Sequence, residues 1–183
     1  MRQALKLHPD SRCDAETGIE VYVSRGRNGS LLLHYYLTGI GNIVIPPHAG
    51  WARANELWRH TCFEAFVRAA PGRAYYEFNF APSTQWAAYR FGGYRSGMSF
   101  ANEIGTPSIE LRYNAECFEL RAHLKLDGLP DLPNDLAWRL GLAAVIEETS
   151  GRKSYWALAH PPGKPDFHHS DCFALELPAA LGP

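Results

Sequence analysis

Short runs in which apolar and polar residues alternate with a period of two dominate this sequence. The clearest is CFELRAHLKLD, residues 117–127, in which every second residue from Phe118 to Leu126 is apolar. Side chains of an extended chain point alternately to opposite faces, so this run predicts a strand with one buried and one wet face. The preceding run, residues 108–114, alternates as well, with Ile109, Leu111 and Tyr113 expected inward, and the two runs predict a hairpin.

Roughly ten runs of this kind follow one another, separated by Gly, Pro and polar residues. Besides the hairpin above they are IEVYVSR (19–25), SLLLHYYLTG (30–39), NIVIP (42–46), CFEAFVRA (62–69), YYEFNFAP (75–82), TQWAAYRF (84–91), AWRLGLAAVIEE (137–148), RKSYWALAH (152–160) and CFALEL (172–177). The run 137–148 would also suit a buried helix, but the alternation from Trp138 to Ile146 favours a strand. We therefore predict an all-β fold, an antiparallel β-sandwich of the jelly-roll or immunoglobulin-like kind.

Size and charge limit the classes of protein to which the chain can belong. With 183 residues, 46% of them hydrophobic, we expect one domain spanning residues 1–183. The 18 basic and 19 acidic residues nearly cancel, so a nucleic-acid partner is not expected. No run has the length of a signal peptide or a membrane span, which predicts a cytoplasmic protein without membrane association. Four scattered cysteines without a CxxC pair predict small buried residues.

Three polar residues on two consecutive strands form the first candidate site. In the run 75–80, Glu77 and Asn79 share a face with Tyr75, and in the run 62–69 Glu64 shares a face with Cys62. If these strands pair, the two carboxylates approach each other, as in acid/base catalysis or in bidentate binding of sugar hydroxyls. The alternative is an exposed sheet face balanced by arginines.

Aromatic residues are more numerous than a core of this size needs. Trp51 and Trp58, in the loop 46–60, are candidates for an exposed clamp, whereas Trp86 and Trp156 lie within strands. Flat rings beside polar groups suit carbohydrates, because a pyranose stacks its C–H face on an indole. The loops 92–107, 127–135 and 160–171 complete the regions in which specificity is expected.

The segment HPPGKPDFHHSD, residues 160–171, concentrates histidine and aspartate. A metal site there is the minority interpretation, because the spacing of His160, His168 and His169 fits no zinc signature. We expect instead a Pro-rich loop fixed by hydrogen bonds from His and Asp to the backbone. No GxSxG elbow or phosphate-binding loop is present, so nucleophilic catalysis is not predicted.

Three stretches, LWRHTCFEAFVRA, YYEFNFAPSTQWAAYRFGGYR and SYWALAHPPGKPDFHHSDCFALEL, together resemble the DOMON-like domains of bacterial proteins of the murB-neighbour type, which are similar to family 9 carbohydrate-binding modules. The resemblance covers nearly the whole chain, and its most specific part runs from Glu77 to Tyr89. It implies a non-catalytic β-sandwich that binds a small ligand, a sugar in some relatives and haem in others. The haem-binding relatives imply Met98 with His160, His168 or His169 as iron ligands, although Met98 lies in a loop here.

We expect a sugar or a saccharide-containing metabolite as the ligand and no cofactor, with haem, a sugar-acting enzyme using Glu64 and Glu77, and a protein-interaction module as alternatives. The resemblance implies carboxylate, amide and arginine groups on the sugar hydroxyls and tryptophans against its faces. The predicted ligand-binding residues are Glu64, Glu77, Asn79, Trp86, Tyr89, Arg95, Trp58 and His168.

Overall fold

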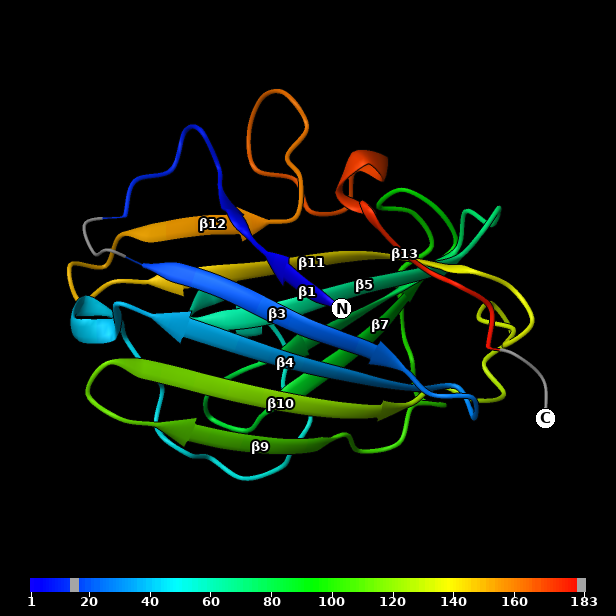
Figure 1. Ribbon diagram of the computed structural model, residues 1–183, viewed down its shortest axis with the longest axis horizontal. Coiled ribbons are helices and arrows are strands. Elements are labelled where there is room, and N and C mark those ends of the chain that lie inside the picture. The colour runs from blue at the N-terminus through cyan, green and yellow to red at the C-terminus, as the bar shows by residue number, and fades with distance from the viewer. Residues whose placement is uncertain (14–16, 181–183) are drawn as a thin grey trace.

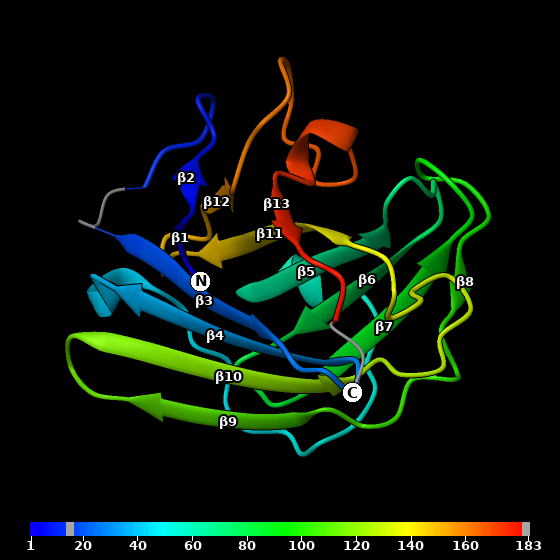
Figure 2. The same ribbon diagram turned by 45° about the vertical axis from the view of Figure 1, so that its right-hand side comes forward.

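The computed structural model describes residues 1–13 and 17–180 and consists of two packed antiparallel sheets (Figure 1). The five-stranded sheet lies in front in Figure 1, and Figure 2 shows the larger sheet beside it. The strands of the five-stranded sheet, in spatial order, are β1 (Arg2–Ala4), β3 (Gly18–Arg25), β4 (Ser30–Thr38), β10 (Cys117–Lys125) and β9 (Ser108–Tyr113).

The second sheet is larger and carries the candidate site. Its strands, in spatial order, are β2 (Lys6–Leu7), β12 (Lys153–Ala157), β11 (Trp138–Glu147), β5 (Cys62–Ala69), β6 (Tyr75–Phe80), β7 (Trp86–Phe91) and β8 (Ser99–Phe100), and β13 (Leu175–Leu177) pairs with the start of β11. Three short 3-10 helices, η1 (Ile40–Asn42), η2 (Leu57–Arg59) and η3 (Ser170–Cys172), lie in the connections. The predicted all-β antiparallel sandwich is confirmed.

Side chains from the facing surfaces of the two sheets form the main core. Phe63 of β5 and Phe118 of β10 stack across the interface with ring centroids 5.9 Å apart. On β11 the alternation from Trp138 to Ile146 puts five residues into this core, as predicted. Apolar burial of this kind provides the main stabilisation of a sandwich.

The N-terminal segment links the two sheets. β1 pairs with β3 in the smaller sheet and β2 pairs with β12 in the larger one. Leu5 lies between β1 and β2, is buried in the main core, and its backbone N–H donates to the carbonyl of Ile19 at 2.9 Å. Residues 2–7 therefore hold neighbouring edges of both sheets.

The structure agrees with most predicted strands and corrects some details. The predicted hairpins β3–β4 and β9–β10 are present. The run 42–46 is not a strand, because η1 and an isolated bridge at Ile43 replace it. Tyr113 was expected inward but is 75% exposed, since it ends the edge strand β9. No helix in the described ranges is both long and apolar enough to cross a membrane.

Candidate functional site

The candidate site lies on the face of the larger sheet that points away from the main core. Alternation on β5, β6 and β7 directs one set of side chains into the sandwich and the other set to this second face. A second apolar cluster covers that face, to which Phe66, Tyr75 and Tyr89 contribute from the strands and Phe167 and Phe173 from the loop after β12. The six residues of β6 are all buried for this reason, and the alternative of an exposed acidic face is wrong.

A cavity of about 440 Å³ opens between this face and its covering loops. That volume lies within the range of small-molecule sites. Both polar and aromatic side chains line this cavity. The lining residues are Trp58, Glu64, Glu77, Tyr89, Phe91, Arg95, Met98, Val145, Tyr155, Pro165, Phe167 and His168.

Strand register brings the two glutamates together. Glu64 of β5 is opposite Asn79 of β6, and Phe66 is opposite Glu77, so Glu64 and Glu77 are diagonal neighbours on one face. The Asn79 amide donates to Oε1 of Glu77 at 2.8 Å. Glu64 is 4% and Glu77 5% exposed, and neither carboxylate has a lysine or arginine within salt-bridge distance in the described part of the chain. The floor of the cavity therefore carries a pair of buried acids.

Burial determines how this pair holds protons. It raises the pKa of Glu77 to about 7, against opposing effects of the Asn79 hydrogen bond and the charge of Arg95. Burial and then the neighbouring charge of Glu77 hold the pKa of Glu64 well above its ordinary range. Two carboxyl groups this close titrate as one system, so near pH 7 the pair retains a proton. One member can then donate a hydrogen bond while the other accepts.

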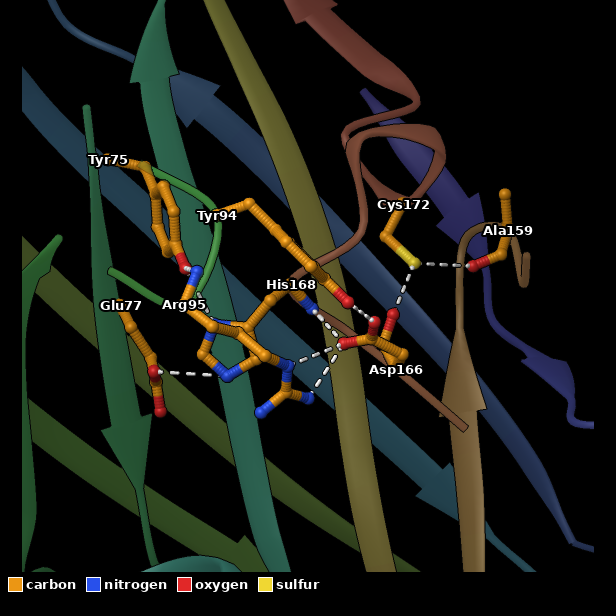
Figure 3. Close-up of polar contacts among 8 residues, drawn as sticks. All are labelled: Tyr75, Glu77, Tyr94, Arg95, Ala159, Asp166, His168 and Cys172. Atoms are coloured by element: carbon orange, nitrogen blue, oxygen red, sulfur yellow. Dashed lines mark hydrogen bonds and ion pairs between the residues drawn. The ribbon is translucent and has the colours of Figure 1, made fainter. Parts of the chain in front are cut away.

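His168 lies beside Glu77 and is fixed by its neighbours (Figure 3). Its Nδ1 lies 2.8 Å from the Tyr75 hydroxyl, and its Nε2 lies 3.8 Å from Oε2 of Glu77. The Tyr75 oxygen already accepts the backbone N–H of Arg95 at 3.3 Å, so its own proton is available for Nδ1. Burial, followed by the charge of Arg95, lowers the pKa of His168 to about 4. The ring is therefore neutral, and its Nε2 faces Glu77.

Arg95 is held at the edge of the cavity by Asp166. Its Nε and Nη2 donate to Oδ1 of Asp166 at 3.2 and 2.7 Å, while the Tyr94 hydroxyl donates to Oδ2 at 2.6 Å. Burial pushes the pKa of Asp166 upward, but the hydrogen bonds from Tyr94 and Arg95 outweigh it and the pKa ends below its ordinary value. Arg95 also has a left-handed backbone, φ 49°, which a non-glycine residue adopts only where its surroundings enforce it.

Aromatic rings form much of the remaining wall. Trp58, from η2, is 40% exposed and meets the ring of Tyr89 with centroids 6.2 Å apart. Tyr155 and Phe167 form a second pair, at 6.2 Å, on the β12 side. The cavity thus combines a polar floor with apolar, ring-bearing walls.

The structure brings most of the predicted residues to this cavity. Six line it directly: Trp58, Glu64, Glu77, Tyr89, Arg95 and His168. Asn79 is fully buried and acts through its hydrogen bond to Glu77. Trp51, the other tryptophan of the expected clamp, is exposed and does not line the cavity.

Trp86 requires a correction. It was expected to stack on the ligand, but it is 2% exposed and points into the main core, on the opposite face of β7 from Tyr89. The guanidinium of Arg53 lies over its ring, 4.3 Å from the centroid. Alternation along β7 is the physical reason, because Trp86 and Tyr89 are three residues apart and so point to opposite sides.

Sequence reasoning missed several residues of the site. Phe91 shares a strand face with Tyr89, so the same period of two could have placed it. Tyr155 and Phe167 reach the cavity from β12 and from the loop after it, which only the tertiary fold brings near β6. The role of Asp166 as partner of Arg95 had no local signal, because 71 residues separate the two.

The histidine-rich loop behaves as the majority interpretation expected. Nε2 of His160 donates to the carbonyl of Lys6 at 2.8 Å, and Nδ1 of His169 accepts the N–H of Asp171 at 3.3 Å. Among the described residues no three His, Cys, Asp or Glu side chains are grouped to hold a metal ion.

The residues present do not fit a haem site. Met98 lines the cavity and so does His168, but both ring nitrogens of His168 face protein groups, Tyr75 and Glu77. Axial ligation needs an imidazole nitrogen free to approach the iron. His160 already donates to a backbone carbonyl and does not line the cavity.

Comparisons with known proteins show the fold. No protein-family model matches the sequence, and no curated protein sequence matches it either. A candidate carbohydrate-binding protein from Bacteroides uniformis superposes with a TM-score of 0.61 at 16% identity, covering 93% of this chain and 83% of that one. A family 9 carbohydrate-binding module from Caldicellulosiruptor kristjanssonii, solved with cellotriose, gives 0.51 at 11% identity, covering 87% and 74%.

Proposed function

We propose that the cavity binds a saccharide or a saccharide-containing metabolite and that the chain, residues 1–183, acts as one non-catalytic binding domain. The observation that carries this proposal is the buried Glu64–Glu77 pair at the floor of an aromatic-walled cavity of about 440 Å³. The fold supports it, because the module from Caldicellulosiruptor kristjanssonii that shares this fold was solved with cellotriose.

The chemistry of the lining suits a polyhydroxylated ring. A carboxylate accepts two hydroxyl hydrogen bonds, and a protonated carboxyl also donates one, so the pair matches groups that both donate and accept. The Nε2 atom of His168 adds a further hydrogen-bonding group beside Glu77. Trp58 and Tyr89 offer ring faces for the C–H surface of a sugar. Arg95 completes the rim.

The arrangement of the carboxyl groups supports binding over hydrolysis. Glycoside hydrolysis needs one carboxyl group on each side of the scissile bond. Glu64 and Glu77 instead lie side by side on adjacent strands of one sheet face. Both would approach a ligand from the same side, as two hydrogen-bonding groups do.

One observation favours a second candidate function, a hydrolase that acts on sugars. Burial raises the pKa of Glu77 to about 7, as a general acid requires. Chromogenic glycosides test this candidate at pH 5 to 8. We expect the protein to hydrolyse these glycosides no faster than buffer alone does. Release of the chromogen that is lost in Glu77→Gln would replace the binding proposal with catalysis.

A thermal-shift screen followed by calorimetry tests the binding proposal. Neutral mono- and oligosaccharides, amino sugars and N-acetylated sugars are compared, each at several concentrations. A ligand at a hundred times its dissociation constant stabilises the fold by about 2.7 kcal/mol, a rise of a few degrees in the thermal midpoint. We expect one saccharide class to bind.

Matched variants assign the binding to the cavity. Glu77→Gln keeps the size of the side chain and is expected to weaken binding at least tenfold, while Glu110→Gln, at an exposed position of β9, leaves it unchanged. Binding that is equal in both variants, or no binding by any saccharide, contradicts the proposal.

A further inference from the structure

The cavity contains more acid than its own cations neutralise. Arg95 is the single arginine or lysine among its lining residues, and its guanidinium donates two hydrogen bonds to Asp166. The second basic group, His168, is neutral because burial and then the charge of Arg95 lower its pKa to about 4. Glu64 and Glu77 are thus left without a committed cationic partner.

Glu64 is the less satisfied member of the pair. Its side chain is 4% exposed and lines the cavity, and no other side chain in the described ranges forms a hydrogen bond or an ion pair with it. Glu77 at least accepts the amide of Asn79 and faces His168. A buried polar group without a partner is costly, so such groups in native proteins point to a missing partner.

We propose that the missing partner is a protonated amine of the ligand, held between the Glu64 and Glu77 carboxylates. This inference rests on the proposed function, because it takes the same cavity to be the binding site and narrows the ligand to an amino sugar or a related amine-bearing saccharide. An ammonium group has three donors and no acceptor, which matches two carboxylates that only accept once the proton they share has left.

The walls suit a cation as well as the floor does. Trp58 and Tyr89 line the cavity together with the two acids, and rings of this kind attract an ammonium group within about 6 Å of their centroids. An ammonium group would also replace the proton that the two carboxyls otherwise share, since it stabilises both charges at once. A neutral hydroxyl in the same place would leave that proton bound.

The test compares sugars that differ in one group. Glucose, its derivatives with an amine at carbon 2, 3 or 6, and the N-acetyl form of each amine are titrated into the protein by calorimetry at pH 7. We expect one amine to bind at least tenfold more tightly than both glucose and its own N-acetyl form. Glucose carries an uncharged hydroxyl of similar size at the same position, so the comparison with glucose separates charge from shape. The N-acetyl form keeps the nitrogen but removes its charge and adds bulk.

Variants connect the preference to the pair. Glu64→Gln and Glu77→Gln are each expected to reduce the amine preference to within threefold of glucose, while the exposed control Glu110→Gln retains it. If one of the two variants fails to fold, the other variant and the sugar series with the wild-type protein still test whether the amine preference depends on the pair. A preference that persists in both folded variants overturns the inference.

The outcomes separate this inference from the proposed function. If glucose or an N-acetyl sugar binds as tightly as every amine, the amine inference is wrong and the saccharide site stands. If no member of this series binds, the amine inference is wrong, and if the wider saccharide screen also finds no ligand, the proposed function is wrong as well. A preference for an amine that both glutamine variants abolish supports both.

Discussion

At the scale of single residues, Glu77 links the site to stability. The ordinary pKa of a glutamate is 4.5, and the pKa of Glu77 in the folded protein is about 7. At a pH between these two values the unfolded chain has released a proton that the folded chain keeps. The free energy of unfolding therefore falls as pH rises through this window and stays lower above it. A shift of this size corresponds to roughly 3 kcal/mol.

We therefore predict that Glu77→Gln stabilises the protein at pH 8 by up to about 3 kcal/mol relative to wild type and has little effect near pH 4. Urea unfolding at a series of pH values measures the difference. The lowered pKa of His168, about 4, acts in the opposite direction, since its stabilisation is lost as pH falls below 6.5. Because His168 is present in both proteins, its contribution largely cancels. A difference that is the same at pH 4 and pH 8 would contradict the assigned pKa.

Two tryptophans have opposite roles that substitution separates. Trp86→Ala removes a core side chain and should cost about 3–5 kcal/mol of stability. Trp58→Ala removes a 40% exposed ring at the cavity, so it should change stability by less than about 1 kcal/mol and weaken ligand binding. Denaturant unfolding and calorimetry measure the two effects. The reverse pattern would restore Trp86 as the stacking residue.

At the scale of elements, the site depends on a contact between the turn after β7 and the loop 160–171. Asp166 accepts hydrogen bonds from Tyr94, Arg95 and the backbone of His168. In Asp166→Asn an amide replaces one acceptor oxygen. We predict faster amide hydrogen exchange in the loop 160–171 with unchanged exchange in β5.

The control for that experiment is Asp171→Asn, in the same loop, whose side chain is 63% exposed and contacts no residue of the β7 turn in the described chain. It should leave exchange in the loop nearly unchanged. Equal effects of both substitutions would show that the contact does not hold the loop.

Sequence predicted those elements whose signal is local. The alternation of 117–127 and 137–148 predicted β10 and β11. Alternation also put Glu64 on the face of Cys62 and Glu77 on the face of Asn79, but only the pairing of β5 with β6 makes these one face. It failed for β1, β2 and β8, which have two or three residues each and are extended only because a neighbouring strand accepts them. The run 42–46 is apolar enough for a strand, but η1 takes up its start and its pairing is an isolated bridge between Ile43 and Glu148.

The site shows the same division. Residues fixed by strand periodicity, such as Glu77 and Tyr89, could be predicted, whereas the partner of Arg95 could not, because a distant loop supplies it. Trp86 was assigned wrongly because of its residue type and its place in the motif from Glu77 to Tyr89. The period of two already put its side chain on the other face of the strand from Tyr89.

At the scale of the whole molecule, the N-terminal segment should contribute more stability than its length suggests. Leu5 lies in the main core where residues 2–7 pass from one sheet to the other. We predict that Leu5→Ala costs about 2–4 kcal/mol, and that Lys6→Ala, whose side chain is exposed, stays within about 0.5 kcal/mol. Thermal and urea unfolding measure both. Equal stability of the two variants would mean that the sheets hold together without this segment.

The burial of β6 on both faces has a consequence for how such a protein diversifies. One side of the strand supports the sandwich and the other forms the binding floor, so a substitution there that alters recognition also affects folding. Most residues of the surrounding loops are exposed, so fewer of them carry this double constraint. New specificities should therefore accumulate in the loops around residues 51–58, 92–98 and 160–168, while the acidic floor is inherited with the scaffold.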